Sequence, residues 1–156
     1  MRSMVLLGFL AFGGVLCTRA ANAGVIVLHG KGVQIYGCTQ AEAGYAWHLK
    51  APDAVLTDSA GHTIGHHSAG PSWQAKDGST VTGNLLSTSQ APQTDAIPWL
   101  VLGAKDHTGN GLFTKVSYIV RSATKGGSAP STGCNPVHSG VEVRVDYSAT
   151  YIFFSE

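Results

Sequence analysis

The last part of the chain alternates strictly between apolar and polar residues. Over residues 141–148, valine or tyrosine occupies every odd position, and a charged residue or serine occupies every even one. Successive side chains of a strand point to opposite faces, so this pattern places one face against a core and the other in water. The pattern predicts a half-buried strand, which the aromatic residues at 151–154 continue toward the terminus. Such a strand needs partners, so we expect the chain to build a sheet.

Short runs with strand character recur along the rest of the chain. The segments expected to form strands are 25–28, 33–36, 45–49, 54–56, 62–64, 72–74, 80–82, 98–102 and 116–120. Asp77-Gly78, between two of these segments, is a strong hairpin signal. No window of about eleven residues or more keeps a helical period with caps. Many short strands separated by Gly, Pro, Asn and Asp predict a single all-β domain, an antiparallel β-sandwich or barrel.

Residues 1–23 differ in character from the rest of the chain. A positively charged start is followed by an apolar run at 5–17 and a small-residue triplet at 21–23. This order is typical of a secretory signal peptide, and the apolar run is shorter than the roughly 20 residues that cross a bilayer. We therefore predict cleavage after Ala23, which leaves 24–156 as one β-rich domain secreted to the periplasm or the extracellular medium.

Cleavage would change the charge of the protein. Losing Arg2 and Arg19 leaves eight basic residues against nine acidic ones, a formal net charge of −1. A near-neutral domain without a basic stripe has no broad attraction for nucleic acid, so no nucleic-acid partner is expected. Leu16 precedes Cys17 where a lipoprotein signal needs a small residue, so no stable membrane anchor is expected either.

Cys38 and Cys134 are the cysteines that remain after the predicted cleavage. An even number of cysteines in an oxidising compartment favours a disulfide, and this one would close most of the domain. The alternatives are two free thiols or a pair of metal ligands.

Three of the seven histidines gather in one segment. His62, His66 and His67 lie around glycines, and neutral imidazole is a common ligand of zinc and copper. On a straight strand, however, His66 and His67 point to opposite faces, and His62 lies roughly 13 Å from His66. Their spacing matches no zinc motif. A Cu or Zn site at these residues is therefore an alternative hypothesis, and the leading hypothesis below implies no cofactor.

His67 and Trp73 are a second candidate site. Trp73 follows the Gly70-Pro71 turn, near which His67 is expected to form a hydrogen bond. An exposed tryptophan can stack on a sugar ring or anchor a protein partner, whereas a buried one fills a core. The pair is thus a candidate binding surface at the mouth of a pocket, and the alternative is that both side chains are packed away.

No motif in the chain names a reaction. There is no G-x-S-x-G nucleophile elbow, and few acidic residues are available for paired-carboxylate chemistry. The leading hypothesis is a binding or cell-envelope interaction module rather than an enzyme, with a small molecule, a glycan or a protein as partner. A small hydrolase of an extracellular or envelope polymer is a further alternative.

Four blocks of the sequence together resemble a known family. In chain order they read GVQIY with Cys38 at 32–38, HSAGPSW and DGS at 67–79, AIPWL at 96–100, and GG, AP and TGC at 126–134. They resemble the secreted bacterial and fungal family catalogued as domain of unknown function 3455. The resemblance implies an exported domain whose two cysteines match Cys38 and Cys134. It implies no activity and no catalytic residues.

Overall fold

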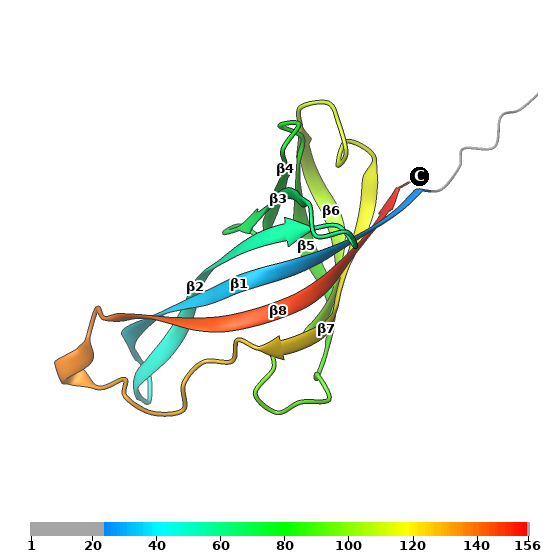
Figure 1. The fold of residues 1–156 in the computed structure, drawn as a ribbon. Helices are drawn as coiled ribbons and strands as arrows, with labels where there is room; N and C mark the ends of the chain where they lie inside the picture. Colours follow the sequence, from blue (N-terminus) through cyan, green and yellow to red (C-terminus); the bar gives the residue numbers. More distant parts are fainter. Residues whose placement is uncertain (1–23, 156) are drawn as a thin grey trace, which may run out of the picture.

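Eight β-strands close into a barrel in the computed structural model, which describes residues 24–155; the predicted signal peptide lies outside them. The strands are β1 (Gly24–Ala41), β2 (Gly44–Thr57), β3 (Thr63–Ser68), β4 (Ser72–Ala75), β5 (Thr80–Ser89), β6 (Trp99–Thr108), β7 (Val116–Gly126) and β8 (Glu142–Ser155), with a short 3-10 helix, η1 (Pro136–His138), before β8. Each strand pairs antiparallel with the next, and β8 pairs with β1 (Figure 1). The all-β prediction is confirmed, and of the two predicted architectures, sandwich and barrel, the barrel is the one observed. In residues 24–155 no helix is long and apolar enough to cross a membrane.

β1 and β2 are longer than the sequence pattern predicts. Segments 25–28 and 33–36 belong to one strand, and so do 45–49 and 54–56. Gly30 lies within β1 and does not form a turn. Glycine is needed there because a Cβ would lie 2.6 Å from Cε2 of the buried Tyr151. Within residues 24–155, β3 pairs with β2 only over 54–57, so Pro52 lies where β2 is an edge, the place where a sheet tolerates proline.

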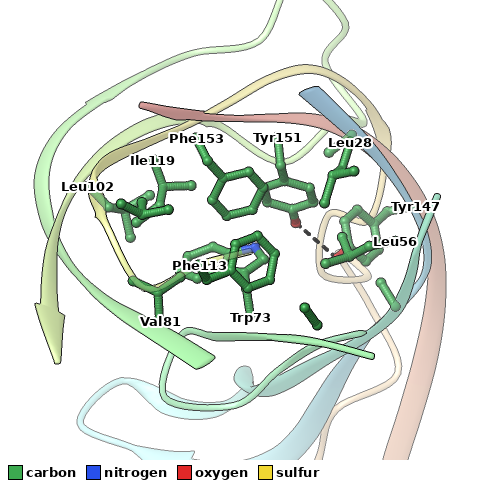
Figure 2. Packing of buried hydrophobic residues seen from close by; sticks show 14 of the residues in the cluster. Leu28, Leu56, Trp73, Val81, Leu102, Phe113, Ile119, Tyr147, Tyr151 and Phe153 are labelled. Atoms are coloured by element: carbon green, nitrogen blue, oxygen red, sulfur yellow. Dashed lines mark hydrogen bonds between the residues drawn. The ribbon is translucent and has the colours of Figure 1, made fainter. Parts of the chain in front are cut away.

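The loop between β6 and β7 closes one end of the barrel. Phe113 in this loop is fully buried, and its ring centroid lies 4.7 Å from that of Phe153 (Figure 2). The N–H of Leu112 donates to Oδ2 of Asp77 at 2.8 Å, and the N–H of Phe113 donates to Oγ of Ser79 at 3.1 Å. The predicted Asp-Gly turn therefore also anchors the closed end.

Apolar side chains from most of the strands fill the closed half of the barrel. The large side chains most deeply buried in this core are Leu28, Leu56, Trp73, Val81, Leu102, Phe113, Val116, Ile119, Tyr151 and Phe153. Figure 2 shows aromatic rings from β4, β8 and the β6–β7 loop meeting across this interior. Burying a side chain of this size stabilises a fold by roughly 1.5–3 kcal/mol, so this half supplies much of the driving force for folding.

The opposite end, which we call the mouth, has a shorter wall on one side. Within the described residues, β2 and β5 run on past their pairing with the short β3–β4 hairpin (Figure 1). Leu49 and Leu85 lie opposite the buried residues Tyr36 and Leu102 and therefore share the inner face with them. Leu49 and Leu85 are nevertheless 56% and 58% exposed. The inner surface is thus open to solvent beside the β3–β4 hairpin.

The segment between β7 and β8 lies along the far ends of β1 and β2 (Figure 1). The predicted disulfide between Cys38 and Cys134 is confirmed, and it joins β1 to this segment across 96 residues. Trp47 Nε1 donates to the carbonyl of Thr132 at 2.8 Å, and the N–H of Cys38 donates to the carbonyl of Val141 at 2.9 Å. These contacts hold the segment against the mouth.

Candidate functional site

The β3–β4 hairpin places His67 and Trp73 inside the barrel. They are cross-strand partners, 3% and 1% exposed. Their rings stack, with centroids 4.5 Å apart and an angle of 6° between the planes. The inward positions follow from strand alternation, because the neighbouring residues His66 and Gln74 are exposed. The pair therefore lies on the inner wall rather than on the outer surface.

His67 is held as a neutral imidazole. Its Nδ1 lies 2.9 Å from the carbonyl of Ser72, next to the predicted turn. Because a carbonyl can only accept, Nδ1 carries the proton and Nε2 keeps its lone pair. Burial lowers the pKa of His67 to about 4, the hydrogen bond to Ser72 opposes this, and the charge of Arg121 lowers it further. At neutral pH the ring is uncharged.

Three tyrosines continue the polar group away from His67. The ring of Tyr151 meets that of His67 edge-on, with ring centroids 5.1 Å apart. The hydroxyl of Tyr151 lies 3.1 Å from the hydroxyl of Tyr147 (Figure 2). The hydroxyl of Tyr36 donates to the carbonyl of Gly127 at 2.6 Å. Burial raises the pKa of all three phenols, so each stays protonated and can donate a hydrogen bond.

Arg121 brings a positive charge to the inner face of β7. It lies between Leu100 and Tyr151 in the sheet, and its Nε and Nη2 donate to the carbonyl of Pro98 at 3.0 and 2.8 Å. Among residues 24–155, the ion pairs within 4.0 Å involve other side chains. Burial lowers the pKa of Arg121, and the phenols of Tyr151 and Tyr147 oppose this. Since a guanidinium keeps its proton in proteins, the mouth holds a cation without an acidic partner.

Three buried donors have no acceptor within the described residues, and two of them belong to this group: Gln34 Nε2 and Trp73 Nε1, the third being Trp99 Nε1. Gln34 lies under the β7–β8 segment, because a Cβ on Gly127 would come within 3.3 Å of Gln34 Cγ. A buried N–H without an acceptor costs about 1–3 kcal/mol. A ligand that brings an acceptor atom to these donors would therefore form hydrogen bonds that the protein alone lacks. We call the whole set the mouth cluster: Gln34, Tyr36, His67, Trp73, Arg121, Tyr147 and Tyr151.

The three candidate metal ligands do not share a face. His62 lies on the β2–β3 turn, where its Nδ1 is 3.0 Å from Oδ2 of Asp58. His66 is exposed on the outer face of β3, whereas His67 is buried on the inner one. In residues 24–155 no group of three or more His, Cys, Asp or Glu side chains is placed to hold a metal ion. The structure thus brings His67 together with Trp73 but not with His62 and His66.

Most of the mouth cluster was not singled out from the sequence. A signal for Arg121 existed, because strand alternation places it in the same set as Ile119, so a charged residue takes a core position. Gln34 likewise falls between inward positions of a strand and carries a polar side chain. The residues missed are Gln34, Tyr36, Arg121, Tyr147 and Tyr151.

Residues 19–155 match the model of the family described as Protein of unknown function (DUF3455). The chain belongs to the DUF3455 family. The resemblance carried by the four sequence blocks is thereby confirmed. No curated protein and no solved structure matches the chain.

The blocks that carry the DUF3455 resemblance converge on the mouth, except for DGS, which anchors the closed end. The first block supplies Gln34 and Tyr36, and the second supplies His67 and Trp73. AIPWL supplies the carbonyl that binds Arg121, and GG supplies the carbonyl that binds the hydroxyl of Tyr36. Segments far apart in the sequence therefore build one place in the barrel.

Proposed function

We propose that this DUF3455 protein is an exported binding module that takes a small molecule at the mouth of its barrel. The observation that supports this is that two donors of the mouth cluster, Gln34 Nε2 and Trp73 Nε1, are buried without an acceptor. Polar groups left unpaired inside an apolar barrel lower stability, and a bound ligand that accepts from them restores the lost hydrogen bonds. The exposed inner-face residues Leu49 and Leu85 lie where the ligand would enter.

Binding is better supported than hydrolysis. The buried ring of His67 is bonded to a backbone carbonyl rather than to a carboxylate. Among residues 24–155, no serine or threonine hydroxyl is hydrogen-bonded to a histidine ring. The His62–Asp58 pair lies on an exposed turn, away from the mouth. A nucleophile, a base and an orienting acid in one cleft would be needed for the hydrolytic alternative.

Export is the other half of the proposal. The Cys38–Cys134 disulfide supports it, because disulfides persist in oxidising compartments outside the cytosol. Intact-mass analysis of the protein recovered from a secreting host should show the loss of residues 1–23 and of two hydrogens. A full-length protein with all three cysteines, Cys17, Cys38 and Cys134, open to alkylation would contradict export.

The indole N–H signals of the three tryptophans give a direct test of the site. In ¹⁵N-labelled protein, we expect fragments that bind at the mouth to shift the signal of Trp73. The signal of Trp47, whose Nε1 is already bonded to Thr132, should stay in place. The fragment set should hold acids, bases and neutral compounds in equal numbers, so that the test does not depend on the class of ligand.

Variants Trp47→Phe, Trp73→Phe and Trp99→Phe assign the signals by loss of one peak each. The proposal fails if no fragment shifts the Trp73 signal. It also fails if every fragment that binds shifts the Trp47 signal instead, since the site would then lie between β2 and the β7–β8 segment.

A further inference from the structure

The unneutralised charge of Arg121 is the feature that selects a class of ligand. Two of its five N–H donors point to one carbonyl, that of Pro98. The other three are available to Tyr151, whose phenol supports the charge, and to a bound group at the mouth. Arg121 is only partly buried. A planar guanidinium with free donors matches a carboxylate, which can accept two parallel hydrogen bonds.

The groups around Arg121 are donors rather than acids. The mouth cluster offers an amide N–H, an indole N–H and the one phenol O–H of Tyr147 and Tyr151 that is not used in the bond between them, and it contains no Asp or Glu. The charge of Asp53 acts on Tyr147, but the Asp53 carboxylate is exposed and accepts from Nη2 of Arg144 at 2.6 Å. The field at the mouth is therefore positive and rich in donors, which favours an anion with several acceptor oxygens.

The entrance beside these donors is apolar. Leu85 lies on the inner face of β5, opposite Leu102 of β6. Two residues along β6, Leu100 is the cross-strand partner of Arg121. Leu49 lies opposite Tyr36, on which the charge of Arg121 also acts. Both leucines are more than half exposed, and apolar surface on a ligand would cover them. The entrance thus suits a ligand that is charged at one end and apolar at the other.

We propose that the mouth binds an amphipathic organic acid, with its carboxylate on Arg121 and its hydrocarbon part against Leu49 and Leu85. This inference rests on the proposed function, and it names the class of ligand for that site. The N–H groups of Gln34 and Trp73 would donate hydrogen bonds to the remaining lone pairs of the head-group oxygens.

Isothermal titration of the purified protein with octanoate, octanamide and octylamine tests the inference without any mutation. The three probes share a chain length and differ in charge. We expect octanoate to bind at least tenfold more tightly than octanamide, because a hydrogen bond to a charged group is worth roughly 1.5–3 kcal/mol. Octylamine should bind more weakly still, since its cation faces Arg121.

Two pairs of matched variants locate the binding. Arg121→Gln should remove the preference for octanoate over octanamide, whereas Arg144→Gln, the same change on the outside of β8, should keep it. Leu85→Glu should weaken octanoate binding several-fold by repulsion. Leu86→Glu should not, because Leu86 is equally exposed but lies on the outer face, against Gly103.

The outcomes separate this inference from the proposed function. If octanamide binds as tightly as octanoate, or if Arg121→Gln keeps the preference, the organic-acid inference is wrong. It is also wrong if acids leave the Trp73 indole signal in place while neutral or basic fragments shift it, and the mouth would still be a binding site. If no compound of any class shifts that signal, both proposals fail together.

Discussion

At the scale of single residues, the barrel interior depends on His67 remaining uncharged. The ring stacks on Trp73 and has carbonyl, phenol and guanidinium groups around it. Protonation would add a second positive charge beside Arg121 inside a barrel that already holds an unpaired cation. A neutral histidine is tolerated there because its one N–H donates a hydrogen bond to the carbonyl of Ser72.

Acid should therefore destabilise the protein in a defined range of pH. Burial lowers the pKa of His67 from 6.5 to about 4, so between these values the unfolded chain binds a proton that the folded chain does not. The free energy of unfolding should be unaffected above pH 6.5 and should fall by about 3 kcal/mol as the pH drops to 4. Urea denaturation at half-unit steps of pH measures this loss.

The variant His67→Phe should remove that slope while keeping a ring against Trp73, and His66→Phe, on the outer face, should retain it. Titration of Asp58 and Asp77 does not contribute to the loss of stability between pH 6.5 and 4. Backbone hydrogen bonding from His62 lowers the pKa of Asp58, and hydrogen bonding from Ser79 lowers the pKa of Asp77. Their contributions are lost only below the ordinary value of 3.8. An unchanged slope in His67→Phe would contradict the assignment.

Gly127 is a second residue with a measurable role. Its φ of +86° requires glycine, and a Cβ would lie 2.7 Å from Cβ of Tyr147 and 3.0 Å from Cγ2 of Ile97. Gly140 has nearly the same φ, +84°, with no atom within 4 Å of a Cβ. Gly127→Ala should therefore cost about 1–3 kcal/mol more than Gly140→Ala in the free energy of unfolding. Equal losses would mean that the contact with Tyr147 is relieved without cost.

At the scale of elements, the sequence pattern predicted strands better than their lengths. The alternation at 141–148 and the hairpin at Asp77-Gly78 both appear as predicted, because each is a local signal. β1 was split in two because glycine reads as a turn in isolation. Only the barrel shows that Gly30 faces the ring of Tyr151. Proline likewise suggests an interruption at Pro52, but β2 continues through it. Proline is tolerated there because β3 does not pair with that part of β2, and such pairing between strands cannot be seen in the local sequence.

The Asp77 turn should control the loop at the closed end. Asp77→Ala removes the acceptor of the Leu112 N–H. It also removes the acceptor of the Ser79 hydroxyl, whose oxygen accepts from the N–H of Phe113. We expect a lower melting temperature and faster hydrogen exchange at the amides of Leu112 and Phe113. Asp58→Ala is the control, because Asp58 accepts only from its own turn. Unchanged exchange at residues 112 and 113 would show that Phe113 alone holds the loop.

At the scale of the whole molecule, the disulfide and the barrel closure both join distant parts of the chain. The pairing of the cysteines followed from their number and the predicted compartment. The mouth cluster did not, because its members come from β1, β3, β4, β7 and β8 and meet only when the sheet closes. Of that cluster, local signals identified His67 and Trp73, which are close in sequence.

Reduction of Cys38–Cys134 should destabilise the protein without changing its fold. Removing a native disulfide typically costs about 2–5 kcal/mol, and this one closes a long loop. Cys134→Ser with Cys38→Ser should show this loss in urea, and the wild-type protein with reductant should match it. A double variant as stable as the oxidised protein would show that the backbone bonds between Cys38 and residues 140 and 141 are sufficient to hold the segment.

The pairing of β1 with β8 has a consequence for how the protein is made. Among the described strands β1 is synthesised first, and it must wait for β8, its partner at the seam. Until then the growing sheet has two bare edges, and bare edges recruit strands from other chains. A chain truncated before β8 should therefore aggregate rather than fold. Threading across a membrane as an unfolded polymer and pairing the seam only after release would avoid that hazard.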